Sequence, residues 1–242
     1  MMGRKLLRVT GSDRVDFLQT LVTNEVSGLS GGLVYAALLT PQGKLIADFF
    51  LVPDGDGILI DVDARVAAVL AQRLGLYKLR ADVTLDWDTR RVAQGLGAPP
   101  EGAFPDPRHA TLGWRAYGAE TATIEDWDAR RVAACIPEWG AELGPDTFIL
   151  EAGFDRMAGV DFRKGCYVGQ EVTARMKHKT ELQKGIARVA VDGPAAPGTE
   201  ITSGGKTIGT LHTRAGDEAL AFLRFNRIGD RMTAGHADLR LL

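Results

Sequence analysis

Residues 33–52 read LVYAALLTPQGKLIADFFLV and contain two runs of mainly apolar, β-favouring residues. The runs, at 33–40 and 44–52, are separated by Pro41-Gln42-Gly43, and a proline early in a four-residue turn is typical of a tight connection. After another glycine-containing turn, a third run follows at 58–62. Three such runs joined by short turns predict an antiparallel meander.

Helical patterns are scattered around this meander. Ser12 is positioned to cap a helix whose apolar residues recur every three or four positions and which ends near Asn24, and Asp61 or Asp63 is positioned to cap a second helix. Two more helices are predicted at 125–136 and 170–179, and further strands at 82–87, 90–96 and 110–117. Meanders between scattered helices, without regular alternation of strand and helix, indicate an α+β fold and argue against a Rossmann or TIM-barrel fold.

The chain changes character from residue 185 onward. Short β-rich runs at 186–191, 206–213 and 218–225 alternate with glycine- and proline-containing turns. Such spacing is typical of a small β-barrel. We therefore predict a first region over residues 1–180 and a C-terminal barrel over residues 185–242.

The composition is that of an ordinary soluble globular protein. The chain has 242 residues, 45% hydrophobic and 25% charged, with a formal net charge of -2. No apolar run approaches the roughly 18 residues of a membrane span, and the N-terminal residues lack the pattern of a signal peptide, so we expect a cytoplasmic protein without membrane contact. Two cysteines and four dispersed histidines predict no resident metal site.

The segment RKGCYVGQE, residues 163–171, carries the chemistry-bearing pattern of the sequence. Two glycines flank a Cys-Tyr-Val core, and Gly169-Gln170-Glu171 suits the start of a helix with an acidic residue in its first turn. A helix start and basic neighbours favour the thiolate of Cys166, which is the nucleophilic and metal-binding form. The alternative is a small buried side chain, as expected for Cys135 on its helix.

The same region is basic. Residues 163–188 contain seven Lys or Arg and two acidic residues, a local net charge of +5 in a slightly acidic chain. This charge predicts either a docking site for something anionic or a solvated loop and strand edge. Nucleic acid is an unlikely partner, because the chain is acidic overall and few aromatic residues are interleaved with the basic ones.

The sequence resembles a known family at several points. The segment KGCYVGQE, residues 164–171, resembles the signature of the YgfZ-type folate-binding proteins, bacterial relatives of a mitochondrial factor that helps to mature iron-sulfur proteins. Residues 11–52, 136–143 and 150–154 resemble the wider superfamily that includes the aminomethyltransferase (T-protein) of the glycine cleavage system. The resemblance spans nearly the whole chain.

The resemblance implies a three-lobed arrangement around a central opening that binds tetrahydrofolate or a derivative, with the first two lobes interleaved in residues 1–180. Glu151 matches the acidic residue that contacts the pterin in T-proteins. Asp48 and Lys184 are further cofactor-binding candidates. T-proteins have an adjacent pair of aspartates where this chain has Ala47-Asp48, so the assignment as an enzyme stays open.

Two functions follow from the resemblance. The first is a tetrahydrofolate-binding accessory protein for assembly or repair of iron-sulfur proteins, with its assembly machinery or client proteins as partners. Its functional residues are those of the motif, namely Lys164, Gly165, Cys166, Tyr167, Gly169, Gln170 and Glu171. The Cys166 thiol has three open roles: a transient iron ligand, a partner in a mixed disulfide, or a nucleophile toward a one-carbon unit. The alternative function is a folate-dependent one-carbon transferase, with Asp48 or Glu151 as its acid.

Overall fold

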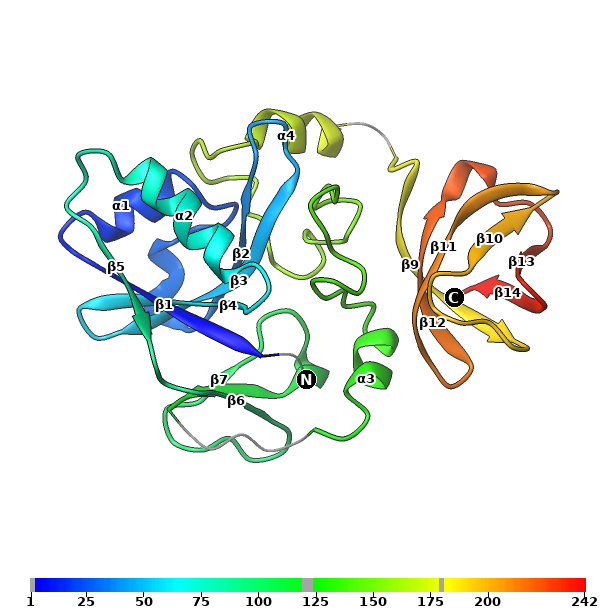
Figure 1. Ribbon diagram of the computed structural model, residues 1–242, viewed down its shortest axis with the longest axis horizontal. Helices are drawn as coiled ribbons and strands as arrows, with labels where there is room; N and C mark the ends of the chain where they lie inside the picture. Colours follow the sequence, from blue (N-terminus) through cyan, green and yellow to red (C-terminus); the bar gives the residue numbers. More distant parts are fainter. Residues whose placement is uncertain (1–2, 119–123, 179–180) are drawn as a thin grey trace. The chain divides into compact units, whose positions relative to one another are not determined.

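A computed structural model describes residues 3–118, 124–178 and 181–242. The chain divides into two compact units, and each unit is built from two segments of sequence (Figure 1). The first unit comprises Met1–Ile124 and Phe154–Ala174, and the second comprises Glu125–Gly153 and Arg175–Leu242. Helix α4 (Gln170–His178) begins in the first unit and ends in the second.

A five-stranded antiparallel sheet forms the centre of the first unit, in the strand order β2-β3-β4-β1-β5. Its strands are β1 (Arg4–Thr10), β2 (Val34–Leu39), β3 (Leu45–Asp54), β4 (Gly57–Asp63) and β5 (Thr84–Asp88). Strands β2, β3 and β4 are the predicted meander, and the helix α2 (Ala67–Lys78) packs against β1 and β3. Because β2, β3 and β4 are consecutive, short turns suffice to connect them.

The register of this sheet sets up one unusual face. Tyr35 of β2 lies opposite Phe50 of β3, Phe50 lies opposite Asp61 of β4, and Asp61 lies opposite Leu6 of β1. Residues directly opposite one another point to the same side of a sheet. Asp48, two positions before Phe50, therefore shares the face, which combines aromatic and acidic side chains.

A small three-stranded sheet, in the order β6-β8-β7, supplies side chains to that face. Its strands are β6 (Val92–Gly95), β7 (Phe104–Pro105) and β8 (Trp114–Tyr117). The first unit also contains α1 (Arg14–Gln19) and two 3-10 helices, η1 (Ser27–Gly31) and η2 (Ala110–Leu112).

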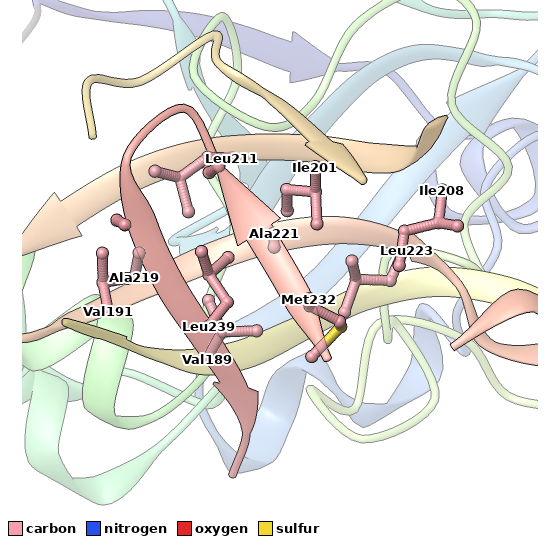
Figure 2. Packing of buried hydrophobic residues seen from close by; sticks show 12 residues of the cluster. Val189, Val191, Ile201, Ile208, Leu211, Ala219, Ala221, Leu223, Met232 and Leu239 are labelled. Carbon is pink, nitrogen blue, oxygen red and sulfur yellow. The ribbon is translucent and has the colours of Figure 1, made fainter. Parts of the chain in front are cut away.

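The second unit is built on a closed barrel with the strand order β10-β11-β12-β9-β14-β13. The strands are β9 (Lys184–Asp192), β10 (Glu200–Ser203), β11 (Lys206–Ala215), β12 (Glu218–Arg224), β13 (Met232–Ala234) and β14 (Ala237–Leu241), with η3 (Phe225–Arg227) between β12 and β13. Figure 2 shows how Val189, Leu211 and Leu223, from three different strands, contribute to one apolar interior. Helix α3 (Trp127–Ala133) packs against β11 and β12.

The first predicted helix is shorter than expected. The structure has α1 only over Arg14–Gln19, and Ser12 does not cap it. Instead, the Ser12 hydroxyl donates to Asp82 Oδ2 at 2.9 Å. The Asp82 carboxylate, 70 positions away along the chain, binds the hydroxyl in place of the helix backbone. The sequence around Ser12 does not reveal this acceptor.

Two other expectations about helices were also wrong. Neither Asp61 nor Asp63 caps α2, which begins after Val66; Asp61 is fully buried in ion pairs, and Asp63 accepts from the Arg65 backbone N–H at 2.9 Å. The helix predicted at 125–136 is confined to Trp127–Ala133, since Cys135 has a φ of +54° and breaks the helix. The predicted strand at 110–117 starts as η2 and becomes a strand only at Trp114. Position 179, the predicted end of the fourth helix, lies outside the described residues.

Candidate functional site

Asp48 lies in the middle of β3 and is 5% exposed. The Tyr35 hydroxyl donates to Asp48 Oδ2 at 3.0 Å, whereas Asp48 Oδ1 is buried and has no hydrogen-bond partner among the described residues. Burial raises the pKa of Asp48, although the positive charges of Arg4 and Arg108 oppose that shift. A buried carboxyl oxygen without a donor is costly, so it is the kind of acceptor that a bound ligand satisfies.

Three guanidinium groups surround the ring of Phe50. The guanidinium carbons of Arg4, Arg108 and Arg115 lie 5.7, 4.9 and 3.9 Å from the centre of the Phe50 ring, respectively. Arg108 also lies 5.6 Å from the centre of the Tyr35 ring. Attraction between a cation and an aromatic face helps to hold the three arginines on this face of the sheet.

Two buried aspartates balance these cations. Arg115 bridges them, because its Nη1 lies 2.9 Å from Asp61 Oδ2 and its Nε lies 3.2 Å from Asp106 Oδ2. Arg4 binds Asp61 at 2.6 Å, and Arg108 binds Asp106 at 2.8 Å. Burial opposes ionisation of Asp106, but Arg108 and Arg115 outweigh it and hold the pKa of Asp106 below its usual range.

Sequence reasoning missed Tyr35, Asp106 and the three arginines of this cluster. The sequence did carry one signal for it, since Asp61 is a charged residue that follows the apolar run Ile58-Leu59-Ile60 inside β4. A charge at an interior strand position is expensive unless it is paired.

The segment that contains Cys166 is anchored by Lys164, which is 6% exposed. The Lys164 ammonium group donates to three backbone carbonyl oxygens, those of Gln19, Val22 and Asn24, at 2.8, 2.7 and 2.8 Å. These carbonyls lie at the end of α1 and in the turns after it. Burial lowers the pKa of Lys164 to about 8.

The segment is also anchored on the other side of the cysteine. Tyr167 is 7% exposed, and Gly169, with a φ of +82°, packs so closely that a Cβ there would lie 2.6 Å from the carbonyl oxygen of Thr40 in the β2–β3 turn. Helix α4 begins immediately after Gly169. Cys166 is exposed between these two anchored points.

The remaining motif residues have smaller roles in the geometry. The Gln170 side chain lies 3.5 Å from the carbonyl oxygen of Gly165, at the outer limit for a hydrogen bond. Glu171 is exposed in the first turn of α4, and Gly165 has open space around it. Cys135, by contrast with Cys166, is half-buried.

Glu151 and Lys184 come together in the second unit. Glu151 is 8% exposed, and its Oε1 lies 3.5 Å from the Lys184 ammonium group. The Glu151 backbone carbonyl accepts from Ile186 N–H at 2.7 Å at the start of β9. Position 185 must be glycine for this approach, because a Cβ would lie 2.7 Å from the Glu151 carbonyl oxygen.

The structure thus groups the predicted site residues within each unit. Asp48 and the segment around Cys166 belong to the first unit, and Glu151 and Lys184 belong to the second. Within residues 3–118, 124–178 and 181–242, no group of three or more His, Cys, Asp or Glu side chains is arranged to hold a metal ion.

The fold is similar to that of a solved structure, the glycine cleavage system aminomethyltransferase T from Bartonella henselae. The TM-score is 0.79, and the match covers 99% of this chain and 82% of that one. At 15% sequence identity this likeness shows the fold alone. The chain is therefore an α+β protein of the T-protein-like class, with antiparallel sheets and a six-stranded C-terminal barrel, and the predicted fold class is confirmed.

Sequence comparisons identify the family within this class. Residues 183–242 match the model of the CAF17 C-terminal beta-barrel domain. The chain is 31% identical to the human iron-sulfur cluster assembly factor IBA57, mitochondrial, over 93% of this chain and 77% of the human one. It is 33% identical to the IBA57 homolog of Neurospora crassa over 77% of this chain, and spans 52% of that longer protein. The chain belongs to the IBA57/CAF17 family of iron-sulfur cluster assembly factors, as the resemblance to YgfZ-type proteins predicted.

These findings correct the predicted location and support the predicted class of partners. The relatives from human, mouse and Neurospora are named as mitochondrial proteins, so the expectation of a cytoplasmic location was wrong. Membership of the family implies partners in the iron-sulfur machinery. Within the part of the chain that the structure describes, no helix is long and apolar enough to cross a membrane.

Proposed function

We propose that this assembly factor binds tetrahydrofolate or a derivative and acts in the assembly or repair of iron-sulfur proteins through the thiol of Cys166. The observation that carries the folate proposal is Asp48 Oδ1, a buried acceptor without a donor among the described residues. A reduced folate carries several N–H groups, and one of them would supply the missing hydrogen bond.

Glu151 is the second acceptor that supports folate binding. A pterin ring presents an amino group and an adjacent ring N–H as parallel donors, which a carboxylate accepts in a two-pronged arrangement. The Glu151 carboxyl is nearly buried, and Lys184 places a cation 3.5 Å from it. A polar contact in such a place is worth more than the same contact in water.

Calorimetric titration with tetrahydrofolate tests the two acceptors separately. We expect Glu151→Ala to weaken binding by roughly thirtyfold to a thousandfold, since it leaves the pterin donors unpaired at a cost of about 2–4 kcal/mol. We expect Asp48→Asn, which preserves the volume, to weaken binding at least tenfold. Asp86→Asn, at an exposed position of β5, is the matched control and should bind like the parent.

The melting temperature without ligand separates binding from folding in this experiment. It should stay within a few degrees of the parent for each variant, and Glu151→Gln replaces Glu151→Ala if the latter unfolds. Parent-like binding by both folded Asp48 and Glu151 variants would contradict the folate proposal.

The proposal for Cys166 rests on its exposure and on the anchoring around it. Lys164 and Tyr167 are buried on either side, so the segment presents the thiol while its neighbours hold the backbone. Cys166→Ala should therefore leave folate binding unchanged. In cells that lack the native protein, the parent and Cys135→Ala should restore the activity of iron-sulfur enzymes, and Cys166→Ala should not. Full restoration by Cys166→Ala would remove the thiol from the mechanism.

One-carbon transfer is the alternative function, and Asp48 is the observation that favours it. Ala47 weighs against it, because it has no carboxylate where T-proteins have the other aspartate of the pair. Its side chain is fully buried on the face of β3 opposite Asp48. Incubation with tetrahydrofolate and an aminomethyl donor distinguishes the two functions. Catalytic turnover that Asp48→Asn abolishes would favour the transferase.

The predicted basic stretch offers less to an anionic partner than its sequence indicates. Lys164 is buried and its ammonium group is committed to three carbonyls, whereas the Arg163 side chain is 93% exposed. Lys179 lies outside the described residues. Salt-dependent binding of RNA by the purified protein would favour a nucleic-acid function over an iron-sulfur assembly function.

A further inference from the structure

Helix α2 is apolar on two sides. Its buried side carries Ala67, Leu70 and Leu74, which are 3%, 0% and 0% exposed. On its other side, Val69 is 49% exposed and Leu76 is 63% exposed. A surface helix that faces only water usually has polar residues on its outer side, so two exposed apolar residues beside Arg73 are consistent with a side that a partner covers.

A strained and exposed apolar residue follows the end of the helix. Leu79 is 89% exposed, and its backbone adopts φ +42° and ψ -105°, a conformation that residues other than glycine rarely adopt. Neither burial nor an ordinary backbone conformation favours leucine at this position. Strained backbone at an exposed position is characteristic of functional segments.

Helix α2 and the residues that flank it are positively charged. Residues 64–81 contain four basic and no acidic residues. Arg73 is exposed between Val69 and Leu76 at helical spacing, and Arg80, which is also exposed, follows the end of the helix at Lys78 by two residues. Neither Arg73 nor Arg80 forms an ion pair within the described part of the chain. Gly75 leaves open space, since a Cβ there would meet nothing within 4 Å, and a partner can approach the backbone closely.

We propose that this surface, Val69, Arg73, Leu76, Leu79 and Arg80, docks a partner protein through an acidic segment that also carries apolar side chains. The apolar residues would be covered on binding, and the two arginines would pair with carboxylates at the rim, where charge complementarity steers association. The surface does not involve Cys166 or the folate-binding candidates, so it stands independently of the proposed function.

The charges and composition of the surface favour this occupant over two others. In a pair of copies related by a two-fold axis, the same patch meets itself, and residues 64–81 would offer the arginines no carboxylate. A helix that lies in a lipid surface usually inserts Trp, Phe and several Leu, whereas this surface has two leucines, one valine and no aromatic residue. An acidic protein segment matches both its charge and its small apolar area.

Site-specific photo-cross-linking identifies the partner. Leu76 is replaced by p-benzoylphenylalanine in cells, and Leu96, which is 37% exposed elsewhere in the same unit, is replaced in the same way as the control. We expect position 76, and not position 96, to cross-link one protein through a segment rich in Asp or Glu. A product containing a second copy of this chain, or no product above the control, would overturn the proposal.

Binding of the purified cross-linked protein then tests the surface chemistry. We expect Arg73→Glu with Arg80→Glu to weaken binding at least tenfold, and added salt to weaken binding of the parent. The matched control, Lys5→Glu with Arg91→Glu, makes the same charge change at two exposed positions of the first unit and should alter affinity by less than twofold. Equal losses of affinity in the two double variants would contradict the proposal. So would binding of the parent protein to mixed phosphatidylcholine and phosphatidylserine vesicles that is as strong as its binding to the protein partner.

Leu79→Gly separates docking from folding. Glycine tolerates the positive φ, and the leucine side chain is almost fully exposed, so the melting temperature should stay equal or rise. We expect the same variant to bind the partner several-fold more weakly. Parent-like affinity of Leu79→Gly would remove Leu79 from the surface.

Discussion

The interior of the barrel and one face of the five-stranded sheet bury different kinds of side chain. The barrel is filled by a cluster of 12 buried apolar residues (Figure 2), and Ser203 is the one buried polar residue among its described strands. The face of the five-stranded sheet around Phe50 buries Asp48 and Asp61, and Arg115 and Asp106 lie over it. Both regions are antiparallel sheets, so strand direction does not account for the difference.

The comparison indicates where function lies. Apolar packing alone is enough to stabilise a barrel, and replacing buried ion pairs by apolar residues often leaves a protein equally or more stable. A face that keeps paired charges, together with the unsatisfied Asp48 Oδ1, therefore supports the ligand site that we propose there. The barrel interior has the composition of a structural scaffold.

Arg115→Met should give the largest effect on stability, and it tests whether the charged face depends on pairing. The change leaves Asp61 and Asp106 each without one partner in a buried place, so we expect the free energy of unfolding to fall by about 3–5 kcal/mol. Urea denaturation measures the loss. Arg91→Met, at an exposed position, is the control and should change it by less than about 0.5 kcal/mol. A loss below about 1 kcal/mol for Arg115→Met would mean that the pairing is dispensable.

Leu211→Ala tests the other side of the comparison. Leu211 is fully buried in the barrel, and we expect truncation to cost about 2–4 kcal/mol because it removes apolar contacts and leaves a cavity. Leu211→Met preserves the volume and should cost less than about 1.5 kcal/mol. If thermal unfolding showed the same loss of stability for both variants, the side-chain volume at position 211 would not be what stabilises the barrel interior.

Lys164→Met examines a third way of burying charge, in which backbone carbonyls replace a carboxylate. Methionine has a side chain almost as long as that of lysine, but it leaves three carbonyl oxygens without their donor. We therefore expect the free energy of unfolding to fall by about 1–3 kcal/mol. The alkylation rate of Cys166 should change in the same variant, since its segment loses one anchor. An unchanged rate together with unchanged stability would show that Tyr167 and Gly169 hold the segment by themselves.

Asp54→Asn gives the smallest expected effect and a pH dependence of known sign. Asp54 lies at the end of β3 between Arg90 and Arg8, at 2.7 and 2.9 Å, and hydrogen bonds from Arg90 lower its pKa to about 2. Because the folded pKa lies below the ordinary value of 3.8, the stabilisation is complete above pH 3.8 and is lost as the pH falls through 2. We expect the variant to be about 1 kcal/mol less stable at pH 7, a partly exposed pair being screened by solvent.

Denaturation curves of the parent and Asp54→Asn at several pH values check this prediction. The difference between the two proteins should shrink between pH 4 and pH 2. A difference that is constant over this range would show that the ion pairs at the rim of the sheet contribute little.

Local patterns in the sequence predicted several elements correctly. The meander follows from two apolar runs around Pro41-Gln42-Gly43, because alternation and turn chemistry act over a few residues. The barrel likewise follows from short runs between turns after residue 185, although β10, β13 and β14 are too short or too polar to stand out. Helix ends were predicted less well, since Ser12 and Asp61 both have distant partners that outcompete the local cap.

The sequence by itself determined the family, the α+β class, the strands of the meander, and the residue types around Cys166. Only the tertiary structure decided which charges are buried and what they contact. Arg115 reaches Asp61 across 54 positions of sequence, and Lys164 reaches Gln19 across 145. The physical reason is that the cost of burying a charge depends on all the groups that surround it after folding, and no local pattern contains those groups.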